Sequence, residues 1–385
     1  MNKIIPSVGP IKTTLRDLDQ SKRYHQLKNR LYFFSLFIDV LVLLFIFFSG
    51  YSQNIKLWAQ RLSGMPVIFN GLYLIVFSLL MSVVHFPMSV FSGFYWEHRF
   101  QLSNQSFTQW FWDDLKKTLL GLALVLVMIE FVYFFLAQFP DSWWLWAGAF
   151  WLFISFVIVK ITPHFIIPLF YKYKNIEDEE LRQRIFILFK NCQVSLNDIY
   201  AIDMSSKTKA ANAFLCGMGR TRRVVLSDTL ISNFSIDEIE SVVAHELGHY
   251  KHHDILRLLA VNTVVIFSLF YMMYRLFDSA VPYFGLTGID DISFFPVFIL
   301  TFILVSFLIT PALNAFSRLL ERDADLYGLQ NTTNKGSFVS MMNKLGEMNL
   351  AEKNPSPMVE MFFYDHPPVG KRIAFAQQYV ETNAV

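Results

Sequence analysis

Residues 294–325 read FFPVFILTFILVSFLITPALNAFSRLLERDAD, and this stretch joins the two features on which the fold depends. Residues 294–316 carry no charged side chain, and they are long enough for a helix that crosses the hydrocarbon core of a bilayer, which takes ~20 residues. We expect 315–330 to be helical as a continuation of this span. The stretch therefore predicts a membrane-spanning helix that presents acidic side chains beyond the membrane.

The other apolar sequence falls into five similar blocks. Hydrophobic residues form 54% of the 385-residue chain, above the ~45–50% of ordinary soluble domains. The excess lies in long blocks rather than in an alternating or 3.6-residue pattern, which indicates membrane spans. The blocks cover 31–49, 67–90, 118–138, 143–159 and 258–274. The sequence thus predicts a mostly α fold, a polytopic membrane helical bundle of about six spans.

The distribution of Lys and Arg predicts the orientation in the membrane, because cytoplasmic loops carry an excess of both. Residues 1–30 carry Lys3, Lys12, Arg16, Lys22, Arg23, Lys28 and Arg30. Basic residues are also frequent in 91–117 and 160–257, and sparse in the loops 50–66, 139–142 and 275–293. An even number of spans with both termini in the cytoplasm satisfies this distribution. The N-terminus lacks the pattern of a cleaved signal peptide, so we expect the first span to act as its own insertion signal.

This orientation places two polar parts of the chain on the cytoplasmic side, where we expect them to form one folded unit. The expected division is a membrane region at 1–170 with four spans and a cytoplasmic loop at 91–117, a polar part at 171–257, a two-span hairpin at 258–316 and a second polar part at 317–385. Within the polar parts, the pattern predicts helices at 176–191, 236–252, 336–347 and 367–380, and strands at 198–203 and 222–227. The unit should therefore carry a small β-sheet.

The motif HELGH at 245–249 lies on the predicted helix 236–252. Positions i and i+4 of a helix share one face, so His245 and His249 can point two imidazoles at one ion. Glu246 can then reach the water on that ion. Two His ligands with a Glu general base form the zincin arrangement of metalloproteases, in which zinc lowers the pKa of its bound water towards ~7.

The alternative interpretation of HELGH is a chance match on a polar helix. The residues that precede the motif, Val242 to Ala244, are apolar and make this helix half-buried. Two histidines and a glutamate on such a helix would be costly to bury without partners. The context therefore favours the metal site.

A catalytic zinc takes three protein ligands and leaves one position open. The sequence offers His252, His253, Asp254 and Glu321 for the third ligand. His252 shares the face of His245 but lies ~10 Å further along the same helix, too far to join both ligands comfortably. Glu321 opens ERDAD at 321–325 on a second helix, and Asp325, one turn on, is placed to support a ligand histidine. A solvated charged face would explain ERDAD equally well.

Charge and cysteine content exclude other kinds of site. The net charge is +2, which gives no case for nucleic acid as a partner. The two cysteines, Cys192 and Cys216, are too few for a disulfide framework and form no C-x-x-C pair. A bound metal would therefore have to be held by His and carboxylate side chains.

Several stretches together resemble the type I, a-factor-converting CAAX prenyl proteases, which are integral-membrane zinc metallopeptidases of family 48. The resemblance rests on HELGH, an apolar hairpin and E-x-x-x-D at 321–325, and it covers nearly the whole chain. The other similar stretches are FSGFYWEHRFQLSNQSFTQWFWDDLKK at 91–117, ITPHFIIPLFYKY at 161–173, KAANAFLCGMGRTRRVVLSDTL at 209–230 and DHPPVGKRI at 365–373. The resemblance implies that the polar parts 171–257 and 317–385 form a cytoplasmic zincin-type metalloprotease domain.

The resemblance also implies roles for individual residues. One Zn²⁺ per chain would be held by His245, His249 and Glu321, with Glu246 as general base. Asp325 aligns with an acid sometimes assigned as a catalytic proton donor, although we expect it to support a ligand.

Four further residues would act on the substrate by the same resemblance. Asn212, Ala213 and Phe214 belong to an N-A-F element that pairs with an extended peptide, and His366 would contact the substrate or donate to the oxyanion. Arg372 would join this group and pair with Asp325 or Glu321. Without the resemblance, Asn212 fits a turn and His366 fits a helix cap equally well.

The expected partners are the lipid bilayer and a peptide or protein substrate, with or without an isoprenyl group. The resemblance implies cleavage near the C-terminus of CAAX substrates. One alternative is a bacterial quality-control metalloprotease without prenyl specificity. Others are a non-enzymatic scaffold, against which Glu246 argues, and a zinc transporter, against which the position of HELGH outside the spans argues. The C-terminus, ETNAV, carries no retrieval signal, which favours a bacterial inner membrane over the endoplasmic reticulum.

Eukaryotic members of the family have seven spans, whereas six are expected here. Asp39, His85, Glu130 and Asn262 sit in or near apolar blocks. Ionisable groups at such places usually face a bundle interior or a water-filled cavity. We expect these four to line a hydrated chamber; local hydrogen bonding near an interface is the alternative.

Overall fold

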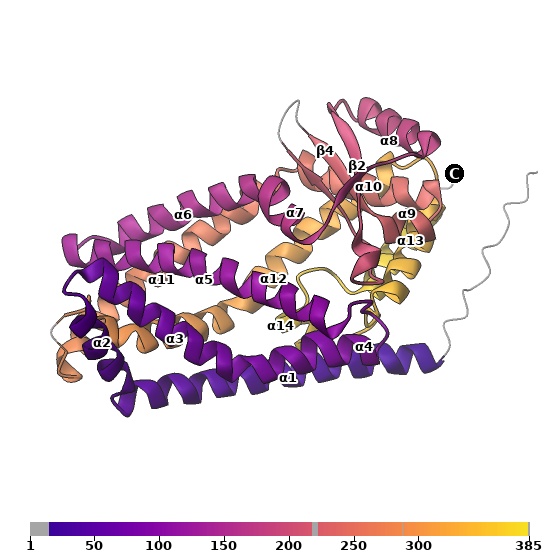
Figure 1. Cartoon of the computed structure of the whole chain (residues 1–385). Helices are drawn as coiled ribbons and strands as arrows, with labels where there is room; N and C mark the ends of the chain where they lie inside the picture. The colour runs from indigo at the N-terminus through magenta and orange to yellow at the C-terminus, as the bar shows by residue number, and fades with distance from the viewer. Residues whose placement is uncertain (1–14, 218–221, 287, 384–385) are drawn as a thin grey trace, which may run out of the picture.

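A bundle of long helices joins a smaller mixed domain at one of its ends (Figure 1). This computed structural model describes residues 15–217, 222–286 and 288–383. Lys3 and Lys12, on which the predicted orientation partly depends, lie outside the described residues, as does part of the similar stretch 209–230.

Six helices are long and apolar enough to cross a membrane among the described residues, which confirms the predicted number. They are α1 (Leu15–Phe48), α3 (Pro66–Ser89), α5 (Phe107–Gln138), α6 (Trp143–Ile161), α11 (Asp254–Tyr283) and α12 (Phe295–Asn331). The sixth span continues without interruption through ERDAD. The predicted extension over 315–330 is therefore confirmed.

The six spans form a closed ring. Each packs against the next in the order α1, α3, α5, α6, α11 and α12, and α12 packs against α1 again. Closure therefore needs no seventh helix. Large side chains such as Leu43, Tyr73 and Trp143 are fully buried together, near the ends of the spans that lie away from the sheet. In contrast, α6 has no buried residue after Gly148, so this helix is enclosed by its neighbours only at the distal end.

The distal end contains a helix that the sequence did not predict. The expected loop 50–66 forms α2 (Tyr51–Leu62), which is too short to span a membrane. Lys56 Nζ lies 2.6 Å from Asp291 Oδ2, and Ser52 donates a hydrogen bond of 2.6 Å to the carbonyl of Ser293. These contacts join α2 to the start of α12.

The predicted cytoplasmic loop at 91–117 is largely helical instead. A π-helical segment (Val90–Trp96) and α4 (Glu97–Arg99) prolong α3. Ser106 and Gln109 then form a capping box that starts α5 at Phe107, because their side chains satisfy the first free backbone N–H groups. Only about seven residues between these helices remain extended or turning.

The mixed domain contains a four-stranded sheet in the order β1-β2-β4-β3. The strands are β1 (Tyr173–Asn175), β2 (Asp198–Ile202), β3 (Ala213–Cys216) and β4 (Arg223–Ser227). β2 and β4 are parallel, and the other neighbours are antiparallel. Both predicted strands are confirmed, and β1 and β3 are the two edge strands of the sheet.

Helices from both polar parts of the chain build the core of this domain with the sheet. They are α8 (Glu179–Asn191), α9 (Asp228–Asn233), α10 (Ile236–Lys251), α13 (Lys335–Met348) and α15 (Val369–Thr382). The short α7 (Ile167–Phe170) leads into the domain, and α14 (Pro357–Phe363) packs against α12. The predicted helices 176–191, 236–252, 336–347 and 367–380 correspond to α8, α10, α13 and α15. The two polar parts therefore do form one unit.

Helices α10 and α12 pack closely against each other, and a glycine allows this approach. A Cβ atom on Gly248 would lie 2.9 Å from the Cα of Ala324 and 3.1 Å from its carbonyl oxygen. Both neighbours are backbone atoms that cannot move aside independently. The absent side chain thus sets the spacing between the helix of HELGH and the helix of ERDAD.

We expect Gly248→Val to force these two helices apart. Overpacking of this kind costs roughly 1–3 kcal/mol, so both the melting temperature and the metal content after equilibrium dialysis should fall. Gly121→Val is the matched control, because Gly121 is also helical and a Cβ atom added there would have nothing within 4 Å. Equal effects of the two variants would contradict this account.

Polar groups within the spans have different surroundings. Asp39 and His85 bind each other across α1 and α3, with 2.7 Å between Oδ1 and Nε2. A carboxylate oxygen of Glu130 is buried without a hydrogen-bond partner, and Asn262 is exposed. That these residues line a chamber stays a prediction.

Candidate metal centre

Helix α10 positions the two histidines of HELGH. Ser235 and Glu238 form a capping box at its start, which satisfies the first free N–H groups of the helix. From this start the helix runs unbroken to Lys251, so His245 and His249 lie one turn apart on the face towards α12. Their Nε2 atoms are 3.2 Å apart, which directs both imidazoles to one point.

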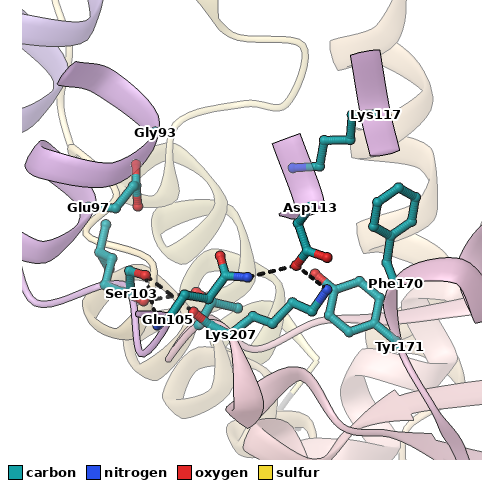
Figure 2. A pocket seen from close by; sticks show the side chains of 11 residues that line it. Gly93, Glu97, Ser103, Gln105, Asp113, Lys117, Phe170, Tyr171 and Lys207 are labelled. Carbon is teal, nitrogen blue, oxygen red and sulfur yellow. Dashed lines mark hydrogen bonds and ion pairs between the residues drawn. The ribbon is translucent and has the colours of Figure 1, made fainter. Parts of the chain in front are cut away.

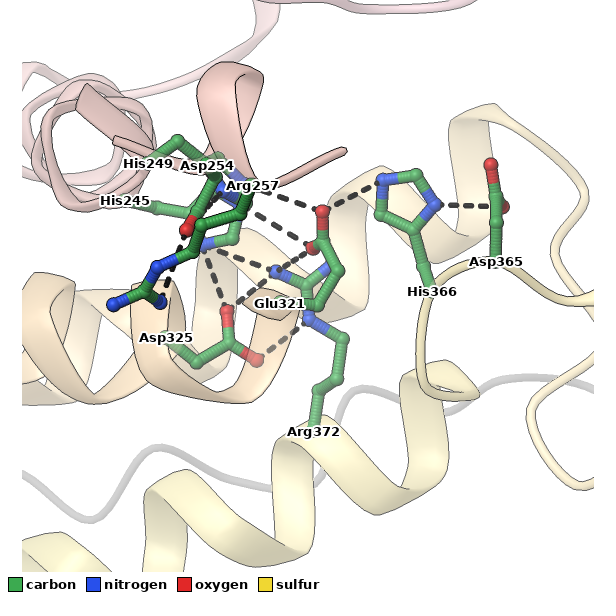
Figure 3. Close-up of polar contacts among 9 residues, drawn as sticks. All are labelled: His245, His249, Asp254, Arg257, Glu321, Asp325, Asp365, His366 and Arg372. Atoms are coloured by element: carbon green, nitrogen blue, oxygen red, sulfur yellow. Dashed lines mark hydrogen bonds and ion pairs between the residues drawn. The ribbon is translucent and has the colours of Figure 1, made fainter. Parts of the chain in front are cut away.

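Helix α12 brings a carboxylate to the same point (Figure 3). Glu321 Oε1 lies 3.2 Å from His249 Nε2, and Oε2 lies 3.5 Å from His245 Nε2. Ligand atoms of these three residues lie within 4.8 Å of one another. The side chain of Glu321 is buried, and its Oε2 has no hydrogen-bond partner.

These three side chains fit a tetrahedral metal. Ligand atoms at ~2.0–2.1 Å from a tetrahedral zinc are ~3.3–3.4 Å apart, close to the separations of His245, His249 and Glu321. A buried carboxylate oxygen without a hydrogen bond is costly, and a cation would satisfy it. The other candidates are arranged differently: His252 packs its ring edge against Tyr327, at 5.7 Å between centroids.

Two carboxylates orient the histidines by contacting their Nδ1 atoms, on the side of each ring that faces away from the other ligands. Asp325 Oδ1 lies 2.9 Å from His245 Nδ1, and Asp254 Oδ2 lies 2.8 Å from His249 Nδ1. Each contact holds the Nδ1 proton and leaves Nε2 free to bind a metal. Asp325 therefore has the supporting position that we expected. Asp254, considered above only as a ligand, has the same position towards His249.

A left-handed turn explains how Asp254 reaches His249. His253 has φ 57°, which ends α10 and starts α11 at Asp254. The new helix brings the Asp254 carboxylate back to the last turn of the old one. The sequence shows an acidic residue five positions after the second histidine. The helix break that brings this carboxylate back to His249 was not predicted.

We expect Asp254→Asn to weaken metal binding by ~10–100-fold, as is usual when a partner of a ligand histidine is lost. The amide keeps the volume but can present its NH₂ group to Nδ1 and favour the wrong tautomer. Competition with a chromogenic chelator measures the affinity. Asp323→Asn is the control, because Asp323 is exposed on α12 and should leave the affinity unchanged; a similar loss there would refute the specific role of Asp254.

Arg372 supplies the positive charge behind the site. Its Nε donates to Asp325 Oδ2 at 2.8 Å, and its Nη2 donates to Oδ1. Nη2 also lies 3.7 Å from Glu321 Oε2. We predicted that Arg372 pairs with Asp325 or Glu321, and in the structure it lies close to both carboxylates. Because the guanidinium is held by Asp325, its contact with a substrate stays a prediction.

His366 approaches the centre from the loop before α15. Its Nε2 lies 3.1 Å from Glu321 Oε1, and its Nδ1 lies 2.8 Å from Asp365 Oδ1. These hydrogen bonds to Asp365 and Glu321 raise the pKa of His366 to about 10, although burial opposes them. The Nε2 atom lies towards the centre and can donate a hydrogen bond to a developing oxyanion.

Burial and charge also change the pKa values of the HELGH side chains. Burial lowers the pKa of His249, but its hydrogen bonds to Glu321 and Asp254 outweigh burial and raise the pKa to about 9. For Glu246, desolvation raises the pKa against the attraction of His245 and His249. A raised pKa makes Glu246 a stronger base, as a proton acceptor for water requires.

Glu246 faces a pocket of about 230 Å³. Its apolar wall combines side chains of α10 and α13 with the chain around β3, and His366 and Arg372 stand at its other side. The lining includes Ala211, Asn212, Ala213, Val242, Met341, Met342, Leu345 and Asn349. Glu246 therefore meets a cavity that can hold an apolar side chain.

The predicted N-A-F element lies at the start of β3. Asn212 receives a hydrogen bond from the backbone N–H of Ser227 and donates its own N–H to Ser227 Oγ. Its side-chain oxygen accepts from the N–H of Ala213 at 2.9 Å. Phe214 follows in the edge strand. Asn212 and Ala213 line the pocket of Glu246, whereas Phe214 is absent from its lining.

Comparisons with known proteins agree with this geometry. The family described as Peptidase family M48 matches residues 175–380, and the one described as CAAX prenyl protease N-terminal, five membrane helices, matches residues 2–172. CAAX prenyl protease 1 of Saccharomyces cerevisiae is 29% identical over 94% of this chain and 85% of its own length. An uncharacterized metalloprotease of Bacillus subtilis, YhfN, is 28% identical over 96% of this chain and 87% of its own length.

A solved structure shares the whole fold. The crystal structure of S. mikatae Ste24p superimposes with a TM-score of 0.85 at 23% identity, and the match covers 97% of this chain and 91% of that chain. The N-terminal match contains the first four spans, and the M48 match contains the last two spans together with the domain that carries HELGH. The chain therefore belongs to peptidase family M48 and is a multi-pass membrane metalloendopeptidase of the CAAX prenyl protease type.

Proposed function

We propose that this metalloendopeptidase uses one zinc ion, held by His245, His249 and Glu321, to cut a peptide bond near the C-terminus of CAAX substrates, including isoprenylated ones. The observation that carries the zinc site is the separation of 3.2–3.5 Å between the ligand atoms of these residues. The substrate class is supported by the similarity to CAAX prenyl protease 1 over most of both chains.

The residues divide the chemistry between them. Zinc, when bound there, supplies Lewis acidity that activates water and polarises the scissile carbonyl. Glu246 accepts the proton of the attacking water and delivers it to the leaving amine. His366, whose Nε2 lies 3.1 Å from Glu321 Oε1, donates to the developing oxyanion. Asp325 and Asp254 hold the histidine tautomers while the charges change.

Strand β3 would bind the substrate backbone. It is the edge of the sheet, and an extended peptide can add to such an edge through main-chain hydrogen bonds. Asn212 and Ala213 bring this edge into the pocket of Glu246. A peptide on β3 would therefore pass beside the general base.

We also propose that the catalytic domain and both termini are cytoplasmic. The excess of Lys and Arg on that side supports this orientation, and the domain lies at the same end of the bundle as the start of α1 (Figure 1). The match to a Bacillus subtilis protein over nearly the full length supports a bacterial inner membrane.

Mass spectrometry of two peptides tests the proposal. The purified chain in lipid nanodiscs is incubated with a farnesylated CAAX peptide and its unmodified counterpart, with and without a chelator. We expect loss of the last three residues of the farnesylated peptide, only without chelator, and restoration by Zn²⁺. Equal cleavage of both peptides would refute prenyl specificity and favour quality-control proteolysis. Cleavage in excess chelator would refute the metal mechanism.

A further inference from the structure

Residues 207–216 lead into β3 and alternate the direction of their backbone hydrogen bonds, although the chain bends at Lys209. Asn212 and Ser227 bond to each other, so the N–H and C=O of Asn212 face β4. In an extended strand, neighbouring residues point these groups to opposite sides. The groups of the odd-numbered residues 207 to 215 therefore face the open edge, where a substrate would pair.

The first part of this edge is already occupied by a segment from the membrane region. Asn104 N–H donates to the carbonyl of Lys207 at 2.9 Å, and Lys209 N–H donates to the carbonyl of Leu102 at 3.0 Å. Ser103 and Thr208 form an antiparallel bridge between these bonds. Residues 102–104 thus stand in the place of a neighbouring strand.

Side chains hold this covering segment in place (Figure 2). Asp113 is buried and receives hydrogen bonds from Gln105, at 2.7 Å, and from Lys207. The Lys207 ammonium also lies over the rings of Phe170 and Tyr171. The contacts tie both sides of the 102–104 pairing to α5 and to the end of the fourth span.

The next position on the edge is covered by one side chain, that of Asn349. The N–H of Ala211 donates to Asn349 Oδ1 at 3.2 Å, and Asn349 Nδ2 donates to the carbonyl of Ala211 at 3.5 Å. A primary amide offers one acceptor and a donor side by side, as a backbone in an adjacent strand would. Asn349 therefore takes the place of a strand partner at Ala211.

The backbone after α13 fixes this amide. Asn349 ends the helix, with its N–H bonded to the carbonyl of Leu345. Leu350 then adopts φ 48°, and Ala351 N–H returns to the carbonyl of Gly346 at 2.8 Å. This left-handed helix end turns the chain sharply and leaves the side chain of Asn349 directed at the strand.

Beyond Ala211 the open edge begins, at Ala213 and Leu215. Because Glu246 gives its proton to the leaving amine, the pocket on its side receives the residues that follow the cut bond. This pocket contains Ala211 and Asn349 together with Glu246. The covered end of the edge is therefore the end at which the released residues lie.

We propose that Asn349 ends the pairing of the substrate with β3 and so limits how many residues can follow the cut bond. This inference rests on the proposed function. Ala213 and Ala211 are two strand residues apart, ~6.6 Å at ~3.3 Å per residue. A substrate that pairs at Ala213 meets Asn349 about two residues later, so only a few residues fit beyond the cut.

A series of farnesylated peptides with two, three, five or seven residues after the modified cysteine tests the limit. The full chain in nanodiscs should cut the three-residue peptide with the highest kcat/KM and the longer ones poorly. Asn349→Ala removes the side chain that stands at Ala211. We expect the ratio of kcat/KM for the five-residue to the three-residue peptide to rise by up to roughly tenfold, as one recovered backbone pairing would allow.

Asn343→Ala is the matched control, because Asn343 lies on the same helix and bonds to Val339 and Lys353 instead. It should leave the ratio unchanged. Asn349→Asp keeps the acceptor for the N–H of Ala211 but loses the donor to its carbonyl, so we expect an intermediate ratio. This variant also tests the proposal if Asn349→Ala does not fold. A merely structural role of Asn349 would lower kcat/KM for all lengths in parallel.

The outcomes separate this inference from the proposed function. If the native chain fails to cut the three-residue peptide, the proposed function is wrong and this inference falls with it. If it cuts that peptide, and both Asn349 variants keep the native length ratio, the proposed function stands and the role of Asn349 is refuted. A raised ratio in the Asn349 variants alone would support both.

Discussion

Glu246→Gln is expected to lower kcat/KM for a cleavable peptide by ~10²–10⁴-fold, the usual contribution of a general acid–base residue, while the metal content stays unchanged. The amide has nearly the same shape as the carboxylate but cannot accept the proton of the attacking water. Glu246 contributes none of the ligand atoms that converge at the centre. Peptide cleavage measured by mass spectrometry, with metal analysis of the same sample, checks both parts.

Glu381→Gln provides the control for this experiment, since Glu381 is exposed near the end of α15. It should leave cleavage at the native rate. Unchanged cleavage by Glu246→Gln would show that another group accepts the proton, and the division of roles proposed above would be wrong. Loss of metal from Glu246→Gln would instead show that the substitution disturbs the ligands themselves.

Glu321→Ala is expected to reduce metal affinity by more than ~100-fold, because loss of a neighbour to a ligand alone costs up to that factor. The change removes the only carboxylate among the converging ligand atoms in the described part of the chain. It also removes the acceptor of His366 Nε2. Activity should therefore fall to background without added metal.

Equilibrium dialysis against a zinc buffer measures this loss, and Asp323→Ala on the neighbouring exposed face of α12 is the control. Millimolar zinc should restore little activity to Glu321→Ala, because the two histidines alone leave the site short of a ligand. Native affinity in this variant would mean that a different residue completes the site, and His366 is near enough to be tested next.

Local patterns predicted most of the architecture. Apolar blocks identified each of the six spans, since a bilayer imposes a length that the sequence displays directly. Helix periodicity paired His245 with His249, because residues four positions apart share one face of a helix. Glu321 could not be chosen over His252 on spacing alone, because its position depends on how α10 packs against α12. The resemblance to a family supplied that choice.

Features that depend on distant contacts were missed. Helix α2 has too few residues for a span, and its contact with Asp291 joins segments more than two hundred positions apart. Asn349 meets Ala211 across 138 positions, and nothing in EMNLAE indicates a strand partner. Asp254 was considered as a ligand only, because the turn at His253 was not foreseen. Pairings of this kind arise from tertiary packing and leave no periodic signal.

Because α12 is one continuous helix, it connects the distal end of the bundle directly to the metal centre. Its 37 residues, with Pro311 inside the helix, rise by ~55 Å along the helix axis, and the rise from Phe295, at the distal end, to Glu321 is ~39 Å. A tilt of only ~3° about the distal end would displace the carboxylate by ~2 Å at that length, whereas catalytic groups tolerate ~0.5 Å. The anchor between Lys56 and Asp291, at the distal end of the bundle, thereby bears on the accuracy of the metal centre.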